Sequence, residues 1–482
     1  MFLGIDLGTS GIRVLLVDGD GKPVASAEAP TTVARPQQGW SEQDPSQWVD
    51  ALETAIAELR LKAREFGTLK GIGVAGHMHG ATLLDANDTV IRPCILWNDT
   101  RSHAEAARLD ETEGVREISG NIVFPGFTAP KLEWVRKHEP ENQARTAKVL
   151  LQAAYLNFYL TGDHVADMSD SAGTSWLDVG ARKWSPRLLE SGHMRPDQMP
   201  RLVEGSEPAG TLRREIAARW GVSPDVVVAG GAGDNAAAAC GTGVLSEGMG
   251  FVSLGTSGVV LAARNGFRPD PDSAVHTFCH AIPQRWYQMG VMLSATDSLN
   301  WLSSITGQKP PALTGLLGES PRPPSHIRFL PYLSGERTPH NDADIRGSFT
   351  GLGTGTNVAD MTQAVLEGVA YGLRDNAEAL KATGARLDHM LCIGGGSASR
   401  YWVTLLATVL GFPLQRPRSG EFGAALGAAR LGLCAATGAK PDDVMAPPDI
   451  GETILPVDSL ASAFNDGYAA FRASYPKIRE IQ

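Results

Sequence analysis

Asp6–Gly11 reads DLGTSG, and Ser253–Gly258 repeats it as SLGTSG. Each copy follows an apolar strand, and the two copies lie about half the chain apart, the spacing expected of a duplicated domain. Backbone N–H groups in such a tight turn can bind a phosphate, and the Thr and Ser hydroxyls add donors. Two facing turns would hold a polyphosphate from both sides. Only the first copy has a carboxylate, Asp6, with which to contact a metal–phosphate complex.

The same order of predicted elements surrounds both turns. In the first half we expect a three-stranded meander, a helix that begins at the Asp44-Pro45 cap, and a further strand: 2–7, 14–17, 24–29, 46–66 and 69–75. In the second half the pattern predicts two strands, a helix, a strand and a helix: 250–254, 259–261, 359–384, 390–393 and 398–410. The stretch 309–324 is rich in Pro and Gly and predicts a surface connection. The domain boundary is expected near residue 245.

Composition and charge narrow the class of protein. At 482 residues the chain is long enough for two or three full domains, and its formal charge of -10 argues against nucleic acid as a partner. No apolar run reaches transmembrane length, and residues 1–6 lack the basic region of a signal peptide. The five scattered cysteines form no CxxC pair. We therefore expect a cytoplasmic protein with reduced, buried thiols and no membrane partner.

A second glycine-rich turn places an acid at the end of a strand. Residues 226–235 read VVVAGGAGDN, so that Asp234 comes just before a small-residue helix over 236–240. In α/β folds the chemistry sits at strand ends, where an Asp can act as general base on a hydroxyl held beside a phosphate. The alternative is that Asp234 is only the N-cap of the following helix.

The segment 76–80, GHMHG, predicts a polar pocket in which His79 hydrogen-bonds to the hydroxyls of a small molecule. A metal site at His77 and His79 is an alternative. It lacks a nearby third ligand, and the pair His276 and His280 lacks the glutamate of an HExxH motif.

Three further motifs each allow a functional and a purely structural interpretation. Residues 95–99, ILWND, combine an aromatic ring, an amide and an acid, as sugar pockets do, although they could equally form a plain strand end. Residues 394–397, GGGS, could pack against adenine and ribose, or form only a tight strand-to-helix turn. The G-x-G-x-x-G of 71–76 is discounted, because its glycines lie inside a strand pattern with no acid about 20 residues on. A P-loop motif does not occur.

Together the motifs resemble the FGGY carbohydrate kinases, of the actin/Hsp70/hexokinase superfamily. The resemblance rests on four turns and two longer signatures, and it covers nearly the whole chain: 6–10, 230–235, 254–257, 394–396, 126–134 and 347–367. It implies an α/β fold of two duplicated ribonuclease H-like domains, 1–245 and 246–482. Each domain would have a central mixed β-sheet, with a cleft between the two.

Within the family, four segments are most similar to the branch that phosphorylates D-xylulose at its 5-hydroxyl: 40–45, 78–85, 95–99 and 333–339. The resemblance implies ATP and Mg²⁺. It also implies that Asp234 is the general base, that Asp6 contacts the Mg²⁺–phosphate complex, and that Met78 and His79 contact the sugar. Two departures occur: the family often has Gln at His77, which would bear on the sugar pocket, and Lys-Asp at 153–154, where this chain has two alanines at an expected helix start.

The candidate site residues form two sets. Those for the sugar are Met78, His79, Trp97, Asn98, Asp99 and Asn235. Those for the nucleotide are Gly8, Thr9, Ser10, Arg13, Gly255, Thr256, Ser257, Gly394, Gly395, Gly396 and Ser397.

Two rival functions stay open. One is a kinase of another ketose or a polyol, and the other is a nucleotide-driven switch of the actin/Hsp70 superfamily. The segments 76–85 and 95–99 and the acid at Asp234 argue against the switch. The expected partners are a small-molecule sugar and ATP, and the oligomeric state is open, with a homodimer as one alternative.

Overall fold

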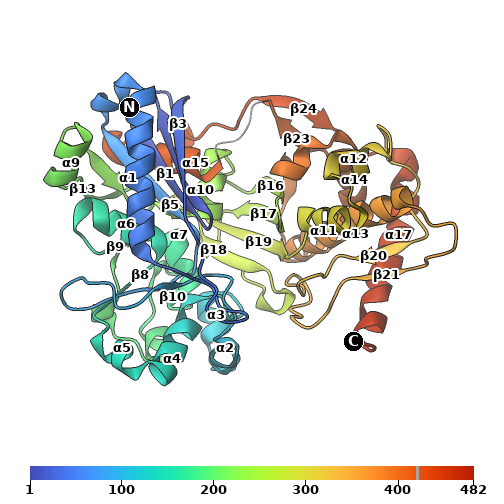
Figure 1. Cartoon of the computed structure of the whole chain (residues 1–482), viewed down its shortest axis with the longest axis horizontal. Coiled ribbons are helices and arrows are strands. Elements are labelled where there is room, and N and C mark those ends of the chain that lie inside the picture. The colour runs from blue at the N-terminus through green and yellow to red at the C-terminus, as the bar shows by residue number, and fades with distance from the viewer. Residues whose placement is uncertain (419–422) are drawn as a thin grey trace.

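The computed structural model describes residues 1–418 and 423–482, and it has two lobes, each built around a seven-stranded mixed sheet (Figure 1). In the first sheet β1, β2 and β3 form an antiparallel meander, and β5 and β14 continue from β1 in parallel. Its strands are β1 (Phe2–Gly8), β2 (Gly11–Val17), β3 (Pro23–Pro30), β5 (Gly71–Gly76), β13 (Pro208–Thr211), β14 (Val227–Ala229) and β15 (Ala232–Gly233).

The second sheet repeats this topology. Here β16, β17 and β19 are antiparallel neighbours, with β18 added at the edge of β19, and β22 and β23 continue from β16 in parallel. Its strands are β16 (Gly248–Leu254), β17 (Gly258–Arg264), β18 (His276–Cys279), β19 (Trp286–Met292), β22 (Leu387–Ile393), β23 (Leu414–Pro417) and β24 (Ile450–Ile454). The two Gly-Thr-Ser-Gly turns thus join equivalent hairpins, β1–β2 and β16–β17. The predicted duplicated α/β fold is confirmed.

Helices and short strands surround the two sheets. The helices are α1 (Pro45–Lys62), α2 (His103–Asp110), α3 (Val115–Ser119), α4 (Thr128–His138), α5 (Pro140–Arg145), α6 (Gln152–Thr161), α7 (Met168–Ser171), α8 (Pro186–Ser191), α9 (Arg214–Trp220), α10 (Asp234–Gly241), α11 (Thr296–Thr306), α12 (Pro310–Gly315), α13 (Val358–Ala382), α14 (Arg400–Leu410), α15 (Gly423–Thr437), α16 (Pro441–Val444) and α17 (Asp458–Arg479). The short strands are β4 (Glu42–Gln43), β6 (Thr82–Leu84), β7 (Cys94–Ile95), β8 (Lys148–Leu150), β9 (Val165–Asp167), β10 (Leu177–Asp178), β11 (Lys183–Trp184), β12 (Arg201–Val203), β20 (Arg328–Leu330) and β21 (Ser348–Thr350).

Local signals in the sequence account for most element boundaries. Asp44 caps α1, because its carboxylate accepts a hydrogen bond from the backbone N–H of Ser46 at 2.9 Å. The stretch 309–324 lies mostly at the surface, as expected, and within it Pro310–Gly315 form α12, where Pro at the first turn starts a helix. The stretch 394–397 does not open α14 directly. A 3₁₀ turn, Gly395–Ala398, comes first, and Ser399 is the N-cap.

One helix crosses from the second half of the chain to the first sheet. α15 lies against β1 and β5 and also packs on α10 (Figure 1). The contact is close enough to require glycine: a Cβ on Gly73 would lie 1.9 Å from the carbonyl oxygen of Ala428, and one on Gly427 would lie 1.8 Å from that of Ala237. α10 shares an apolar core with Phe251 of β16 in the second sheet. The domain boundary near residue 245 remains a prediction. α15 follows this boundary in the sequence, although it packs on the first sheet.

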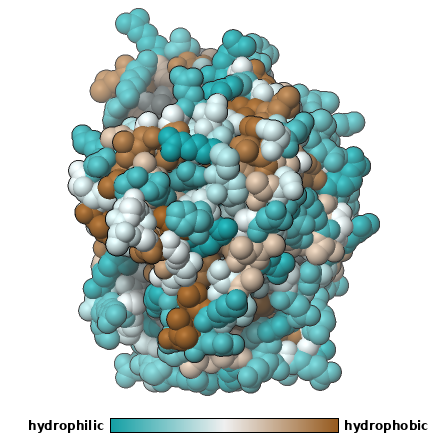
Figure 2. Space-filling model, turned by 90° about the vertical axis from the view of Figure 1, so that its right-hand side faces the viewer, coloured by the Kyte–Doolittle hydropathy of each residue, from teal (hydrophilic) through white to brown (hydrophobic). Residues whose placement is uncertain are grey.

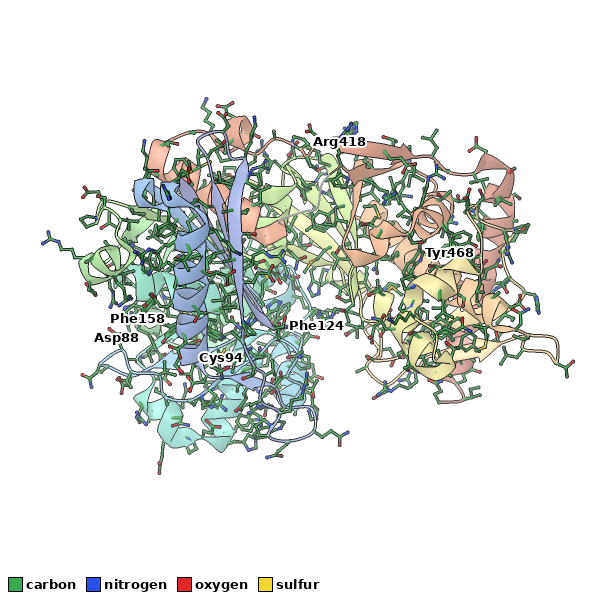
Figure 3. The ribbon with its side chains drawn as sticks, turned by 45° about the horizontal axis from the view of Figure 1, so that its top comes forward. Asp88, Cys94, Phe124, Phe158, Arg418 and Tyr468 are labelled. Atoms are coloured by element: carbon green, nitrogen blue, oxygen red, sulfur yellow. The ribbon has the colours of Figure 1, made fainter. Side chains whose placement is uncertain are left out.

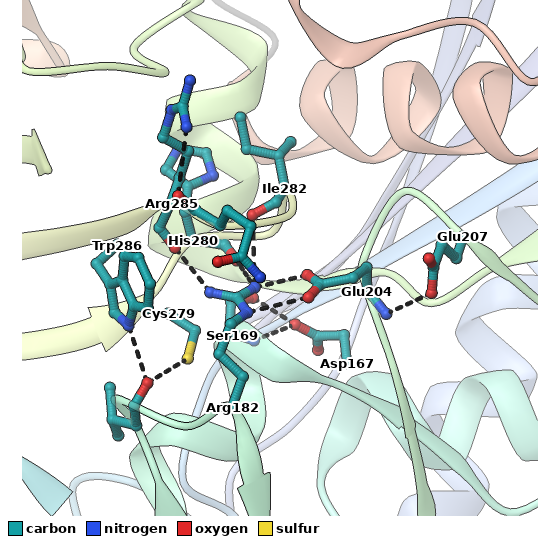
Figure 4. A network of polar contacts seen from close by, with 12 residues as sticks. Asp167, Ser169, Arg182, Glu204, Glu207, Cys279, His280, Ile282, Arg285 and Trp286 are labelled. Atoms are coloured by element: carbon teal, nitrogen blue, oxygen red, sulfur yellow. Dashed lines mark hydrogen bonds and ion pairs between the residues drawn. The ribbon is translucent and has the colours of Figure 1, made fainter. Parts of the chain in front are cut away.

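A polar network also joins the two halves (Figure 4). The Arg182 guanidinium binds the Glu204 carboxylate through two nitrogens, at 3.0 and 2.6 Å. It also donates to the carbonyl oxygens of Arg285, at 2.7 Å, and His280, at 3.1 Å. The Trp286 indole N–H donates to the Val179 carbonyl at 2.9 Å. These bonds hold the β18–β19 hairpin of the second sheet against the first lobe.

The cysteines lie in the interior, and the surface is mostly hydrophilic on the face shown in Figure 2. All five cysteines are buried, as the sequence predicted. Hydrophilic residues surround separate apolar patches on the face of the molecule shown in Figure 2. Among the described residues, none of the helices combines the length and the apolarity that crossing a bilayer requires.

Candidate active site

A small cavity of about 160 Å³ lies where the two halves meet, and Asp234 lines it. Both halves contribute side chains, and six of the residues predicted for a site are among them: Met78, His79, Trp97, Asp234, Asn235 and Ser257. The lining residues are His77, Met78, His79, Trp97, Gly126, Phe127, Asp234, Asn235, Ser257, Val259, Met289, Val291 and Arg337. The cavity also adjoins both Gly-Thr-Ser-Gly turns, because Ser257 lines it and the Trp97 indole N–H donates to the Thr9 hydroxyl at 3.1 Å.

Asp234 stands at the junction of β15 and α10. It is the first residue of the helix and Gly233 is the N-cap, so the alternative of an N-cap aspartate is wrong. Its carboxylate accepts hydrogen bonds from the backbone N–H of Asn235, at 2.7 Å, and from the Asn235 amide, at 3.0 Å. Burial raises the pKa of Asp234 to about 6, and the two Asn235 bonds oppose this shift. The group is therefore mostly ionised at neutral pH and can accept a proton from a bound hydroxyl.

The backbone before Asp234 is held by a buried chain of hydrogen bonds. The Gly233 N–H donates to the Ser169 hydroxyl at 3.1 Å, and that hydroxyl donates to the Asp167 carboxylate. Asp167 also accepts the backbone N–H of Ser169 at 2.6 Å, as N-cap of α7. These hydrogen bonds fix the turn that presents Asp234.

Asp6 lies at the end of β1, close enough to Asp234 for their charges to interact. Burial, and then the negative charge of Asp234, raise the pKa of Asp6 to about 7, while Arg13 opposes the shift. A cation between the two carboxylates would favour their ionised forms.

His79 forms one wall of the cavity. Its Nδ1–H donates to the Gly173 carbonyl at 2.8 Å and its ring stacks on Phe127, which leaves Nε2 as an acceptor. Burial lowers the pKa of His79 to about 3, so the ring is neutral. The buried Lys131 ammonium donates to the His79 carbonyl at 2.8 Å and to the Gly126 carbonyl at 2.6 Å. Lys131 thereby ties together two parts of the wall.

A larger cavity of about 640 Å³ begins at the second turn. Its volume is in the range of sites for nucleotide-sized ligands. Gly255 and Thr256 line it together with Gly395 and Gly396, as predicted for one ligand. α11, α12 and α14 with its N-cap supply most of the other lining residues, including Asn300, Pro310, Pro311, Thr314, Ser399 and Trp402. A third cavity, of about 410 Å³, borders the first turn and is lined by Asp6, Gly8, Ser10 and Arg13 among others.

Some predicted residues lie elsewhere. Asp99 is buried, and its carboxylate binds the Arg101 guanidinium at 2.9 and 2.7 Å and the backbone N–H of Ser41 at 2.6 Å. Neither Asp99 nor Asn98 lines the small cavity, so their sugar contacts remain predictions. Arg13 forms an ion pair with Glu28 at 2.6 Å. The Ser397 hydroxyl donates a hydrogen bond to the Gly394 carbonyl at 2.7 Å. Neither residue lines the 640 Å³ cavity.

The sequence motifs do not predict the place of several residues that line the cavities. Phe127 and Arg337 lie within two stretches that resemble the family, 126–134 and 333–339. The resemblance implies no site role for either residue. Ser257 was assigned to the nucleotide and lines the smaller cavity. Asn300 and Trp402 sit in ordinary amphipathic helices, and no motif around them could have indicated a site.

The two departures noted in the sequence lie beside the small cavity. Nδ1 of His77 is 3.1 Å from the Gln152 amide nitrogen, while its Nε2 is buried without a partner in the described structure. Ala153 is at the start of α6, as expected, and packs on Gly76, where a Cβ would lie 2.9 Å from the Ala153 nitrogen.

Comparison with known proteins gives consistent matches. A model of the N-terminal domain of the FGGY family of carbohydrate kinases matches residues 1–241, and one of the C-terminal domain matches residues 250–436. The chain is 45% identical over 481 residues to the xylulose kinase of Escherichia coli K12, covering 99% of both chains. It is 47% identical over 433 residues to that of Klebsiella pneumoniae, covering 89% of both. The crystal structure of a xyloylose kinase from Brucella ovis has a TM-score of 0.98 and 55% identity, covering 100% of both.

Proposed function

The chain belongs to the FGGY family of carbohydrate kinases, and from this premise we propose that it phosphorylates D-xylulose at the 5-hydroxyl with ATP as donor. The observation that carries the proposal is the arrangement of the two cavities. The cavity of about 160 Å³ suits a small sugar, contains Asp234 and adjoins both turns, and the cavity of about 640 Å³ suits a nucleotide. The xylulose kinases matched over nearly the full chain support the choice of sugar.

In the proposed mechanism Asp234 is the general base. As the 5-oxygen of the sugar forms a bond to the γ-phosphorus, its proton passes to the Asp234 carboxylate. The bond between that phosphorus and the β–γ bridging oxygen breaks, and ADP leaves. Positioning and charge neutralisation supply most of the acceleration in such transfers. The backbone N–H groups of the two turns, with the Thr9, Ser10 and Thr256 hydroxyls, would bind the phosphates.

Asp6 is the residue proposed to hold Mg²⁺. This ion is usually bound by one or two carboxylates together with substrate phosphates, and a single carboxylate beside the first turn fits that donor set. Bound Mg²⁺ would neutralise charge on the phosphates. With a pKa of about 7 when the cation is absent, Asp6 must lose its proton to bind it.

A coupled ADP-release assay tests the function. Purified protein with Mg–ATP is given a panel of ketoses and polyols, including D-xylulose, xylitol and D-arabitol. We expect the highest kcat/KM for D-xylulose. A different preferred sugar would reassign the substrate within the family, and ADP release that no sugar stimulates would favour the nucleotide-driven switch.

The pH profile should report the ionisation of Asp234. A base must be ionised to accept a proton, and the pKa of Asp234 is about 6, so kcat/KM for the sugar should fall as the pH drops through about 6. At saturating Mg²⁺, which favours the ionised form of Asp6, activity should be level above this value until another group titrates. Circular dichroism at each pH checks that the fold persists. A profile that stays flat to pH 5 in folded protein would contradict the assignment.

Replacing His79 with Ala should raise the KM for the sugar and leave ATP binding nearly intact. One hydrogen bond to a hydroxyl is worth about 0.5–1.5 kcal/mol, which corresponds to roughly a 2- to 12-fold rise in KM. The neighbouring His77→Gln, which introduces the residue common in the family, is the matched comparison and should change the ranking of sugars only modestly. If His79→Ala affected ATP alone, His79 would not be a sugar contact.

A further inference from the structure

Arg337 places a cationic group in the small cavity that Asp234 and His79 also line. Its backbone is fixed by its neighbours. Thr338 donates its N–H to the Val291 carbonyl at 3.1 Å, and its hydroxyl donates to the Ala274 carbonyl at 2.9 Å. The Glu336 carboxylate accepts the backbone N–H groups of Arg337, at 2.8 Å, and Leu293, at 3.1 Å. The guanidinium is thus presented from a segment anchored to β19.

The guanidinium itself has few partners. Its Nη1–H donates to Nε2 of His276 at a long 3.5 Å, and its central carbon lies 4.8 Å from the centre of the Phe124 ring. Phe124 lies where the first lobe faces the second (Figure 3). Among the described residues, no carboxylate is within 4.0 Å of the Arg337 guanidinium. A guanidinium has five N–H donors, so most of them remain available to a ligand.

The charge of Arg337 persists in this setting. Burial lowers the pKa of Arg337 to about 10, which still leaves it protonated at neutral pH. Burial raises the pKa of the adjacent Glu336 to about 8, and the charge of Arg337 opposes this shift. Burial also keeps the pKa of His276 well below its usual value, so that this ring stays neutral and can accept the bond from Arg337.

Of the other polar groups of the cavity, His77 offers one uncharged donor, Nε2–H, because its Nδ1 accepts the Gln152 amide N–H. Nε2 of His79 and the Asp234 carboxylate are acceptors, and the Trp97 indole N–H is occupied by Thr9. Sugar hydroxyls can donate to acceptors, whereas a carbonyl oxygen can only accept. The carbonyl of an open-chain ketose therefore needs a donor, and Arg337 has donors to spare.

We propose that Arg337 hydrogen-bonds to the carbonyl oxygen of the ketose and so selects ketoses over the corresponding polyols. The inference rests on the proposed function and deepens it by assigning the end of the sugar remote from Asp234. A polyol has a hydroxyl in place of the carbonyl, and this hydroxyl can find other partners. Substitution of Arg337 should therefore weaken the binding of the ketose more than the binding of the polyol.

The test compares Arg337→Met and Arg337→Lys with the wild type, and Arg346→Met as control. Arg346 is an exposed arginine on the same segment, outside both cavities. Titration calorimetry measures the Kd of D-xylulose and of xylitol, and the ADP-release assay separates KM from kcat. A hydrogen bond to a charged group is worth a factor of roughly 10–100, so Arg337→Met should weaken D-xylulose binding by that factor. Xylitol should be affected several-fold less, and Arg337→Lys should lie between wild type and Arg337→Met.

Two results would overturn the inference while leaving the proposed function intact. One is an equal loss for D-xylulose and xylitol, which would make Arg337 a general part of the cavity wall. The other is unchanged binding of both sugars by Arg337→Met. If the wild type itself shows no D-xylulose-dependent ADP release, the proposed function fails, and the calorimetric comparison of Arg337→Met with the wild type for both sugars still decides whether the guanidinium recognises a carbonyl.

Discussion

Replacing Asp234 with Asn should lower kcat by about 100- to 10,000-fold while leaving the affinity for ATP nearly unchanged. The amide has the shape of the carboxylate but cannot accept the proton of the attacking hydroxyl. Asp234 lines the small cavity and does not line the cavity of about 640 Å³ assigned to the nucleotide, so ATP should bind as before. Single-turnover kinetics with saturating sugar, together with calorimetric titration of a non-hydrolysable ATP analogue, measure the two quantities separately.

The matched control is Asp225→Asn. Asp225 is an exposed aspartate just before β14, on the segment that leads to the same turn. It should keep wild-type turnover. If Asp234→Asn retained a tenth of the wild-type kcat or more, Asp234 could not be the base. A residual rate that still fell as the pH dropped through about 6 would point to another acid, with Asp6 as a candidate because its charge interacts with that of Asp234.

Replacing Gly427 with Ala should destabilise the whole protein. Alanine favours a helix by about 1 kcal/mol over glycine, so helix propensity alone predicts stabilisation. The new Cβ would, however, lie 1.8 Å from the Ala237 carbonyl oxygen and 2.9 Å from the Gly241 nitrogen, both of them backbone atoms that cannot rotate away. α15 would have to move off α10. We expect a loss of about 3 kcal/mol, seen as a lower urea midpoint and a lower soluble yield.

Gly355→Ala is the control for this substitution. A Cβ on Gly355 meets nothing within 4 Å, so the urea midpoint should stay near that of the wild type. A Gly427→Ala protein as stable as the wild type would mean that the two helices tolerate a wider separation. Their close contact would then not be needed for the fold.

The sequence predicted the parts of this fold that are encoded locally. Both hairpins with their turns and the Asp44 cap follow from short patterns of apolar residues, Gly and Pro. Gly8 and Ser10, which are predicted to bind phosphate, belong to the same short motif that leads into β2. These features involve residues close in the chain, and local physical preferences are enough to specify them.

The contacts between distant segments could not be read in the same way. The glycines of 71–76 mimic a dinucleotide motif. Gly71 and Gly73 allow the approach of α15, whose Gly432 carbonyl oxygen would lie 2.4 Å from a Cβ on Gly71, and Gly76 allows the approach of Ala153 in α6. Nothing in the small-residue pattern of α15 tells which sheet it covers. Arg337 and Trp402 likewise enter their cavities through tertiary packing, which a local pattern does not reveal.

The path of α15 also has a consequence for protein synthesis. The central strands of the first sheet are complete once β14 ends at Ala229, but the helix that covers β1 and β5 begins only at Gly423. At a translation rate of ~5–20 residues per second, the ribosome needs roughly 10–40 s to make the intervening chain. During that interval the small-residue face of the nascent first lobe is without its native cover. The first lobe therefore cannot mature cotranslationally by itself, and chaperones that hold exposed apolar surface have a defined period in which to bind it.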